Sequence, residues 1–340
     1  MSKKILEIKD LHVSFDTYAG EVKAVRGVCL SVDEREVLAI VGESGCGKSV
    51  TANSILKLIP KEAGRIKSGE IIFDGKEISQ YSEREMQNIR GSQISMIFQD
   101  PMTAIDPTMK VEKQIMQVIM KHQKINKAEA YKKAIEMMEI VGIPDAKRRG
   151  AQYPFEFSGG MRQRIMIAIA LSCNPKLLIA DEPTTALDVT IQSQILDLLK
   201  DLQKNLGTSI ILITHDLGVV ANMANHAAVM YAGKIVEKAE IIELFENPKH
   251  PYTISLINSI PDLDCKSKQI LSPIEGYPPD LISPPKGCPF SPRCKYSMKV
   301  CRLMIPERID INENHFAHCW LLHENAPKEL IEKMKRDVKI

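Results

Sequence analysis

An apolar run, Val37-Leu38-Ala39-Ile40-Val41, leads directly into the octapeptide Gly42-Glu43-Ser44-Gly45-Cys46-Gly47-Lys48-Ser49. The octapeptide matches the pattern G-x-x-x-x-G-K-[ST], whose glycines let the backbone curl so that successive N–H groups point at phosphate oxygens. Residues 48–58 follow with helical spacing, and a helix adds its positive N-terminal end to such a site. The order of buried strand, glycine-rich turn and helix predicts a phosphate-binding loop (P-loop) in an α/β fold.

Two side chains of the P-loop are suited to bind a nucleotide and its metal ion. Lys48 can reach the β- and γ-phosphates, and the Ser49 hydroxyl can ligate Mg²⁺. The other residues that we expect to contact the nucleotide are Gly42, Ser44, Gly45, Cys46, Gly47 and Val50. Cys46 lies near a helix N-terminus, where thiols tend to be acidified; that it merely fills a variable position is the simpler interpretation.

A second apolar run ends in two carboxylates. Residues 177–180 lead into Asp181 and Glu182, and parallel sheets place their chemistry at the carboxyl ends of strands. Asp181 would hold Mg²⁺, directly or through water, and Glu182 could act as general base toward an attacking water. Together with the P-loop, this pair predicts hydrolysis of a nucleoside triphosphate.

Two further polar residues follow apolar runs. His215 comes after the run 209–213, where it could contact the γ-phosphate, and Gln99 comes after Ile97-Phe98. Taken alone, either residue is more simply interpreted as structural.

The elements around the acidic pair predict a mainly parallel sheet covered by helices. Residues 190–206 carry apolar side chains at 3.6-residue spacing between the runs 177–180 and 209–213, and Gly207 is placed to end that helix. The order strand, helix, strand is typical of parallel sheets.

The middle of the chain, about residues 100–172, contains no comparable apolar run. Stretches 109–123 and 126–141 have helical patterns, and Asn126 with Glu129 resembles a capping pair. We therefore expect a helical subdomain inserted into the α/β core.

A second octapeptide resembles the signature sequence of ATP-binding cassette (ABC) ATPases, and it reads Phe157-Ser158-Gly159-Gly160-Met161-Arg162-Gln163-Arg164. Residues 1 to about 240 carry the motifs of that family in its order: the P-loop, Gln99, the signature, Asp181-Glu182, Ala186-Leu187-Asp188 and His215. Phe157 and Met161 stand where Leu and Gln are usual. The resemblance implies a parallel sheet core, an antiparallel β subdomain and the helical insertion.

The same resemblance implies that two cassettes act as a head-to-tail dimer with ATP between them. The residues that would serve the partner's nucleotide are Ser158, Gly159, Gly160 and Gln163. Asp188 would signal across the interface, and Gln99 would sense Mg²⁺ and the γ-phosphate. An aromatic residue ahead of the P-loop usually stacks on adenine, for which Tyr18 is our first choice and Phe15 the second.

The whole-chain composition is that of a globular protein with a distinct C-terminal part. The 340 residues are 44% hydrophobic and 26% charged with a net charge of +2, which excludes a disordered chain and gives no sign of a nucleic-acid partner. No stretch has the ~18 to 20 apolar residues of a membrane helix, and no secretory segment opens the chain, so we expect a cytoplasmic location. Residues 248–340 hold five of eight Cys, 12 of 19 Pro and two of 18 Gly. We therefore expect an ATPase domain over 1–245 and a Cys-rich domain over 246–340.

Three segments resemble the ATPases of dipeptide and oligopeptide importers: Phe98 to Pro107, His250-Pro251-Tyr252-Thr253, and Gly287 to Cys294. One P-loop without membrane helices also favours an import ATPase. The resemblance implies a second ATPase subunit, which could be a paralogue, two transmembrane permeases and an extracytoplasmic peptide-binding protein, with this chain peripheral at the cytoplasmic face of the membrane.

Four cysteines, Cys288, Cys294, Cys301 and Cys319, crowd a Pro-rich segment with little room for a core. Metal binding is a stronger interpretation than four separate buried thiols. Zinc usually shows close Cys pairs, whereas iron–sulfur clusters accept varied spacings, and the importer resemblance implies a [4Fe–4S] cluster, with Zn²⁺ second. His315 or His318 could replace a thiolate, and Cys265 lies too far upstream to fit.

Two alternatives stay open. The importer could carry nickel or another solute, because the ATPase does not contact the transported molecule. A non-transport ABC ATPase with a ribosome- or nucleic-acid-binding Cys domain is less favoured, since residues 248–340 contain no long basic run.

Overall fold

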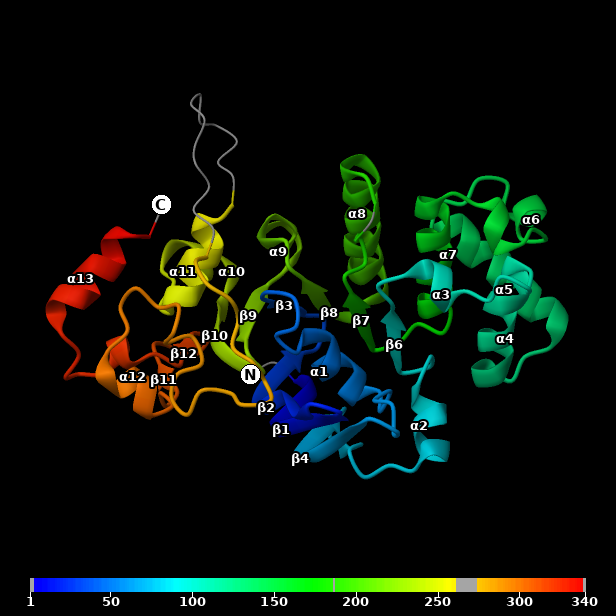
Figure 1. The fold of residues 1–340 in the computed structure, drawn as a ribbon. Coiled ribbons are helices and arrows are strands. Elements are labelled where there is room, and N and C mark those ends of the chain that lie inside the picture. Colours follow the sequence, from blue (N-terminus) through cyan, green and yellow to red (C-terminus); the bar gives the residue numbers. More distant parts are fainter. Residues whose placement is uncertain (1–2, 186, 261–273, 339–340) are drawn as a thin grey trace. The chain divides into compact units, whose positions relative to one another are not determined.

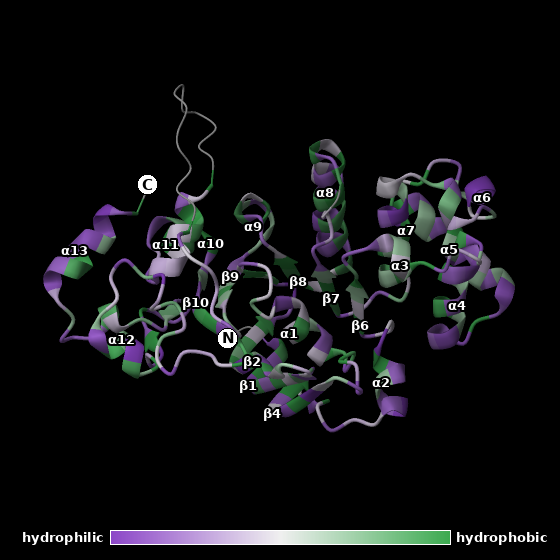
Figure 2. Ribbon diagram, viewed as in Figure 1, coloured by the Kyte–Doolittle hydropathy of each residue, from purple (hydrophilic) through white to green (hydrophobic). Residues whose placement is uncertain are grey.

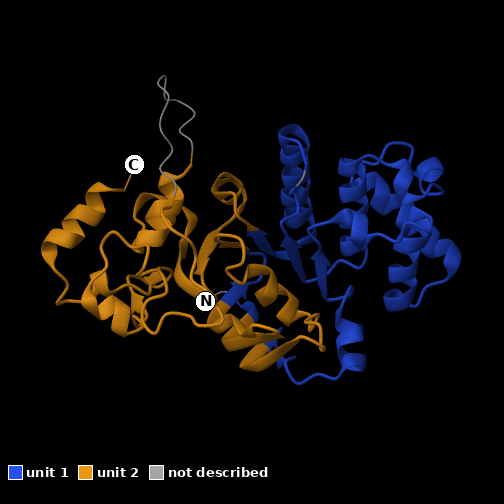
Figure 3. Cartoon of the chain, in the orientation of Figure 1, with its two compact units in different colours: residues 1–6, 31–37, 72–213 blue, residues 7–30, 38–71, 214–340 orange. Residues whose placement is uncertain are grey.

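The computed structural model describes residues 3–185, 187–260 and 274–338 (Figure 1). The chain divides into two compact units (Figure 3). The first contains residues 1–6, 31–37 and 72–213, and the second contains residues 7–30, 38–71 and 214–340. Each unit holds strands, helices and part of the predicted site. No helix among the described residues combines the length and the hydrophobicity needed to cross a membrane.

Three parallel strands form the sheet of the first unit. These strands are β6 (Ile94–Ile97), β7 (Leu177–Asp181) and β8 (Ser209–Thr214). Met96 pairs with Ile179, and Ile179 with Ile211, so β7 lies between its two neighbours. Every residue of the three strands is buried, as expected for a parallel sheet covered on both faces. The predicted runs 177–180 and 209–213 are thus confirmed as strands.

Helices connect the three strands of this sheet. Between β6 and β7 lie α3 (Pro101–Ala104), α4 (Val111–Gln123), α5 (Lys127–Ile140), α6 (Ala146–Arg149), the 3₁₀ turn η1 (Pro154–Glu156) and α7 (Gly159–Leu171), and no strand (Figure 1). The helical insertion is confirmed, and Asn126 caps α5 by accepting a hydrogen bond from the Glu129 N–H (3.0 Å). Apolar and polar residues alternate around α8 (Val189–Leu206; Figure 2), which ends at left-handed Gly207 as predicted.

The second unit builds a mixed sheet on the strand that precedes the P-loop. Strand β3 (Val37–Val41) runs parallel to β9 (His226–Tyr231), which turns back into antiparallel β10 (Lys234–Glu240). C-terminal strand β12 (Phe316–Ala317) pairs antiparallel with β10, and β11 (Ile309–Asp310) pairs with β12. Residues from the far end of the chain therefore extend the sheet that carries the P-loop.

Longer strands than the sequence predicted open the chain. Strands β1 (Lys4–Thr17) and β2 (Gly20–Asp33) each have 14 residues, whereas the strand-like apolar runs in this part of the sequence, which predict shorter strands, cover only residues 5–8 and 22–30. Within the second unit, β2, β1 and β4 (Gly64–Phe73) follow one another in one sheet. In the first unit the end of β4 forms an antiparallel hairpin with β5 (Lys76–Glu77), followed by α2 (Glu83–Ile89).

The remaining helices of the second unit are α1 (Lys48–Ile55), α9 (Leu217–Met223), α10 (Ile241–Glu246), α11 (Pro251–Asn258), α12 (Lys299–Leu303), η2 (Trp320–Leu322) and α13 (Lys328–Arg336). A hydrophobic cluster of Ile254, Tyr296, Cys319, Leu321 and Met334 joins α11, η2 and α13. The expectation that the Cys-rich segment has little room for a core is therefore wrong, because aromatic and aliphatic residues spread over 80 positions of sequence converge there.

Candidate active site

The P-loop of the second unit folds around the Lys48 ammonium group. Lys48 Nζ donates hydrogen bonds to the carbonyl oxygens of Gly42 (2.7 Å) and Glu43 (3.1 Å), and its side chain is buried. Ser49 and Val50 occupy the first turn of α1, which begins at Lys48, while Ser44 and Gly45 are exposed. The predicted strand, loop and helix are all present, and Ser49 supplies an oxygen of the kind that Mg²⁺ prefers.

Glycine is required at two positions of this loop. Gly42 has φ 153° and Gly47 has φ 105°, a region that L side chains rarely adopt. A Cβ at Gly42 would lie 2.1 Å from the Met230 carbonyl oxygen, and one at Gly47 would lie 2.5 Å from that of Ala24. The loop can thus turn only because both positions lack a side chain.

Cys46 differs from the expectation for a thiol near a helix N-terminus. Its side chain is 5% exposed, and burial raises the pKa of the thiol even though the Lys48 ammonium lowers it. The expected acidification is wrong because the loss of hydration outweighs the nearby positive charge.

The first unit brings three predicted residues together at the end of its sheet. Asp181 ends β7 and is buried, and Glu182 follows it with a left-handed φ of 47°. The Glu182 Oε2 atom accepts hydrogen bonds from Gln99 Nε2 (3.1 Å) and from Thr185 Oγ1 (3.0 Å). The carboxylate is therefore oriented by two donors, of which Thr185 was not predicted.

The signature residues start α7. Ser158 is the N-cap residue and accepts a hydrogen bond from the Met161 N–H (3.4 Å), while Gly159 is exposed and Gly160 half-buried. Gln163 is different, because its side chain is 2% exposed and its Nε2 donates to the Pro183 carbonyl oxygen (2.5 Å). The expectation that Gln163 serves a partner's nucleotide is wrong in this conformation, since its amide holds α7 to the segment after Glu182.

Four other predicted positions lie at the ends of strands and helices. Asp188 caps α8, accepting from the Ile191 N–H (3.0 Å), and exposed His215 directly follows β8. Tyr18 is fully exposed in the turn between β1 and β2, whereas Phe15 is only half exposed. Because its side chain is more exposed, Tyr18 is better placed than Phe15 to stack on a base. Ala186 lies outside the described residues.

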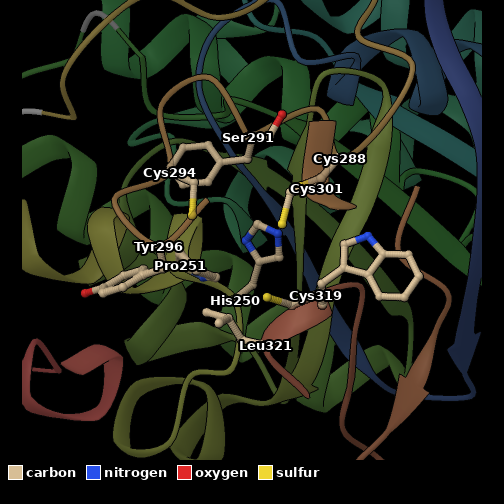
Figure 4. Close-up of a pocket in the computed structure, with 11 residues that line it drawn as sticks. His250, Pro251, Cys288, Ser291, Cys294, Tyr296, Cys301, Cys319 and Leu321 are labelled. Atoms are coloured by element: carbon tan, nitrogen blue, oxygen red, sulfur yellow. The ribbon is translucent and has the colours of Figure 1, made fainter. Parts of the chain in front are cut away.

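The four C-terminal cysteines line one cavity together with His250 (Figure 4). Burial raises the pKa of Cys288 to about 11 and of Cys294 to about 12, and it also raises the pKa of Cys319. The free space is about 10 Å³, roughly the room for one water. No group of three or more His, Cys, Asp or Glu side chains in the described part of the chain is arranged to hold a metal ion.

The histidines expected near these cysteines lie elsewhere. His315 is buried with Nε2 2.9 Å from Glu237 and Nδ1 3.4 Å from Glu243, and His318 Nδ1 faces the Pro306 carbonyl oxygen (3.3 Å). The idea that either replaces a thiolate is therefore wrong, because neither lines the cavity. Cys265 lies outside the described residues.

Comparison with known proteins places these motifs in one family. A model described as "ABC transporter" matches residues 25–185, and one described as "Oligopeptide/dipeptide transporter, C-terminal region" matches residues 236–301. The oligopeptide transport ATP-binding protein OppD of Bacillus subtilis is 58% identical over 325 residues, 96% of this chain and 91% of that protein. The chain belongs to the ATP-binding proteins of the oligopeptide and dipeptide ABC transporters.

Other members and solved structures agree with this family. The dipeptide transport ATP-binding protein DppD of Bacillus subtilis is 50% identical over 98% of this chain and 100% of that protein. A dimeric ATP-binding cassette solved in a post-hydrolysis state with ADP and Pi matches with TM-score 0.63 and 26% identity, over 69% of this chain and 98% of that one. The cbiO1 protein of Clostridium perfringens matches with TM-score 0.61 and 28% identity, over 75% and 95%. The expected α/β P-loop fold of an ABC ATPase is thereby confirmed.

Two residues of the C-terminal part contact the P-loop, although no sequence motif predicts a role for them there. Tyr252 and Arg293 stand in the segments His250 to Thr253 and Gly287 to Cys294, and both contact Glu43. The only signal in the sequence was that these segments resemble the importer ATPases, which does not say what they touch.

Proposed function

We propose that this chain is the ATP-hydrolysing subunit of an importer for dipeptides or oligopeptides. It would work with a second ATPase, which could be a paralogue, two transmembrane permeases and an extracytoplasmic peptide-binding protein, while remaining peripheral at the cytoplasmic face of the membrane. The substrate class is supported by the names of relatives that are 50–58% identical over nearly the whole chain. Hydrolysis is supported chiefly by the Glu182 carboxylate held between Gln99 and Thr185.

The predicted residues that the structure does not contradict have proposed roles in that reaction. Lys48 and the P-loop backbone bind the phosphates of ATP, and Ser49, Gln99 and Asp181 are the proposed Mg²⁺ ligands. Mg²⁺ would neutralise charge on the phosphate oxygens. Glu182 takes the proton from the attacking water. His215 contacts the γ-phosphate, and Tyr18 stacks on adenine. The nucleotide of the partner subunit is contacted by Ser158, Gly159 and Gly160, and Asp188 signals across the interface.

The solute is tested by reconstitution. The ATPase is purified with the permeases that co-purify with it, placed in liposomes, and supplied with the binding protein and either labelled dipeptide, labelled oligopeptide or ⁶³Ni²⁺. We expect ATP-dependent uptake of peptide that Glu182→Gln abolishes. Uptake of nickel without peptide would overturn the peptide assignment, and co-purification with ribosomes instead of permeases would overturn import.

We also propose that Cys288, Cys294, Cys301 and Cys319 hold a [4Fe–4S] cluster, with Zn²⁺ as the second candidate. What supports it is that four thiols from separate segments line one cavity. Its free space of about 10 Å³ would have to enlarge to admit a cluster. A bound cluster would cross-link residues 246–340. Anaerobic purification should give a broad visible absorption band with iron and sulfide, which Cys294→Ser reduces. A colourless protein with stoichiometric zinc would refute the cluster.

A further inference from the structure

Glu43, the second residue of the P-loop, is held by an arginine from the C-terminal part of the same unit. Arg293 Nη1 donates to Glu43 Oε2 (2.6 Å) and Nη2 donates to Glu43 Oε1 (3.0 Å). The Arg293 side chain is 4% exposed and that of Glu43 is 27% exposed. Two parallel hydrogen bonds between a guanidinium and a carboxylate fix direction as well as distance, so this ion pair specifies where the Glu43 side chain lies.

Arg293 is itself held by three further hydrogen-bond acceptors. Its Nε donates to the Glu275 carbonyl oxygen (3.0 Å), Nη2 also donates to that of Ile274 (3.1 Å), and Nη1 donates to the Tyr231 hydroxyl (3.3 Å). The guanidinium is thus oriented by its own surroundings and presents its remaining donors to Glu43 without further ordering.

A tyrosine holds the backbone of the same glutamate. The Glu43 N–H donates to the Tyr252 hydroxyl (2.9 Å). Tyr252 is fully buried, and its ring packs against those of Tyr231 (4.5 Å between centroids) and Phe290 (5.3 Å). Because the Glu43 carbonyl oxygen accepts from Lys48 Nζ, the N–H, the carbonyl and the carboxylate of Glu43 all have assigned partners.

These contacts bear on nucleotide binding because the P-loop works through the directions of its N–H groups. A loop held in one conformation pays less ordering entropy when a phosphate binds. We propose that Arg293 and Tyr252 are positioning residues of the P-loop, through which the C-terminal segment sets the affinity of this subunit for ATP. The inference rests on the proposed ATPase function.

The same two segments also border the cysteine cavity. Arg293 directly precedes Cys294, and Tyr252 comes two residues after His250, and both Cys294 and His250 line that cavity. Phe290 lies between the two sites, since it lines the cavity and packs on Tyr252. A change in the packing of the cysteines therefore has a short route to Glu43.

The test is a double-mutant cycle read by ATP affinity and by steady-state kinetics. Arg293→Met and Glu43→Gln should each weaken ATP binding about tenfold, which corresponds to about 1.4 kcal/mol, and raise KM for ATP, while kcat at saturating ATP stays within about twofold. The double variant should be no weaker than either single one, because the same interaction is lost. Arg308→Met is the matched control, since Arg308 lies over the Phe316 ring and pairs with Asp310, away from Glu43.

The outcomes separate this inference from the function it rests on. If the unaltered chain neither binds nor hydrolyses ATP, the proposed function fails. If it does bind and hydrolyse ATP, two results overturn the positioning role. One is an unchanged affinity for ATP in Arg293→Met, and the other is a loss of affinity in the double variant that equals the sum of the two single losses, so that the coupling energy is zero. Should Arg293→Met not fold, Tyr252→Phe keeps the ring packing and removes only the acceptor for the Glu43 N–H; an unchanged affinity for ATP in that variant would overturn the proposal.

Discussion

At the scale of single residues, the chemistry depends on how a few side chains are held. Glu182 has a left-handed backbone and a carboxylate with two donors, Gln99 and Thr185. A left-handed conformation at a non-glycine residue is costly, and such positions cluster at functional sites. Both donors bind the same atom, Glu182 Oε2, and so fix the orientation of the carboxylate. A fixed orientation suits the proposed role of Glu182 as the general base.

Glu182→Gln should keep ATP binding and lose hydrolysis about 10²- to 10⁴-fold, because an amide cannot take a proton from water. Turnover is measured by phosphate release, and ATP-dependent dimers by size-exclusion chromatography, where we expect the variant to accumulate as a dimer. Glu329→Gln, at an exposed position in α13, is the control. Undiminished turnover in Glu182→Gln would remove Glu182 from its role.

Lys48→Ala should weaken ATP binding strongly, since the ammonium is the one positive charge enclosed by the described P-loop residues. A calorimetric titration with ATP measures this loss, and the thermal unfolding midpoint shows whether the variant is folded. A binding isotherm equal to that of the unaltered chain would contradict the assignment of the P-loop.

At the scale of elements, side chains far apart in sequence tie strands and helices together. Gln163 joins α7 to the segment after β7 through the Pro183 carbonyl oxygen. Asp74, in the β4–β5 hairpin, accepts from Lys3 ahead of β1 (2.8 Å) and from Lys176 ahead of β7 (2.5 Å). Neither link follows the local sequence pattern, so each needs the structure to be seen.

Gln163→Ala should lower the free energy of unfolding by about 1–3 kcal/mol, because it leaves the buried Pro183 carbonyl oxygen without its partner. Urea unfolding of both proteins measures the difference. Ser193→Ala, at an exposed position in α8, should change stability far less. Equal effects of the two substitutions would show that Gln163 does not hold α7.

Asp74 makes a prediction about pH. Hydrogen bonds from Lys176 and Lys3 lower its pKa from 3.8 to about 2, so the folded state favours the carboxylate. The contribution to stability is present above pH 4 and is lost as the pH falls toward 2. Because the lysines are exposed, Asp74→Asn should cost at most about 1 kcal/mol at pH 7, less in high salt. The free energies of unfolding of the two proteins, measured as the pH is lowered, should therefore converge near pH 2. A difference that stays constant with pH would contradict this.

Which elements could be predicted from sequence depends on how local their cause is. Strand β3 and the run of β7 were predicted because a strand buried on both faces is continuously apolar. The end of α8 was predicted at Gly207 because glycine adopts the left-handed conformation that commonly ends a helix. Strands β1 and β2 were shortened because their burial is irregular along 14 residues. The partners of Glu43 were missed because Tyr252 and Arg293 lie 209 and 250 residues away.

At the scale of the whole chain, the C-terminal residues complete the sheet and the surroundings of the P-loop within one compact unit. A chain ending at residue 245 loses β12, Tyr252 and Arg293. It should therefore unfold at lower temperature than the full chain, because β10 loses its pairing with β12 and Tyr231 loses its contact with the Tyr252 ring. It should also bind ATP less tightly, because Glu43 loses both of its C-terminal partners. Calorimetry and an ATP titration measure both quantities, and a shortened chain with unchanged affinity would show that residues 246–340 are independent of the P-loop.

The ion pair between Glu43 and Arg293 has a consequence for how the protein is made. The two residues are 250 positions apart, so at 5–20 residues per second the ribosome adds Arg293 roughly 12–50 s after Glu43. During that interval the nascent P-loop has neither Arg293 nor Tyr252 to hold it. The nucleotide-binding loop therefore reaches its final form late in translation. A chain released before residue 293 contains the P-loop but lacks the arginine that pairs with Glu43.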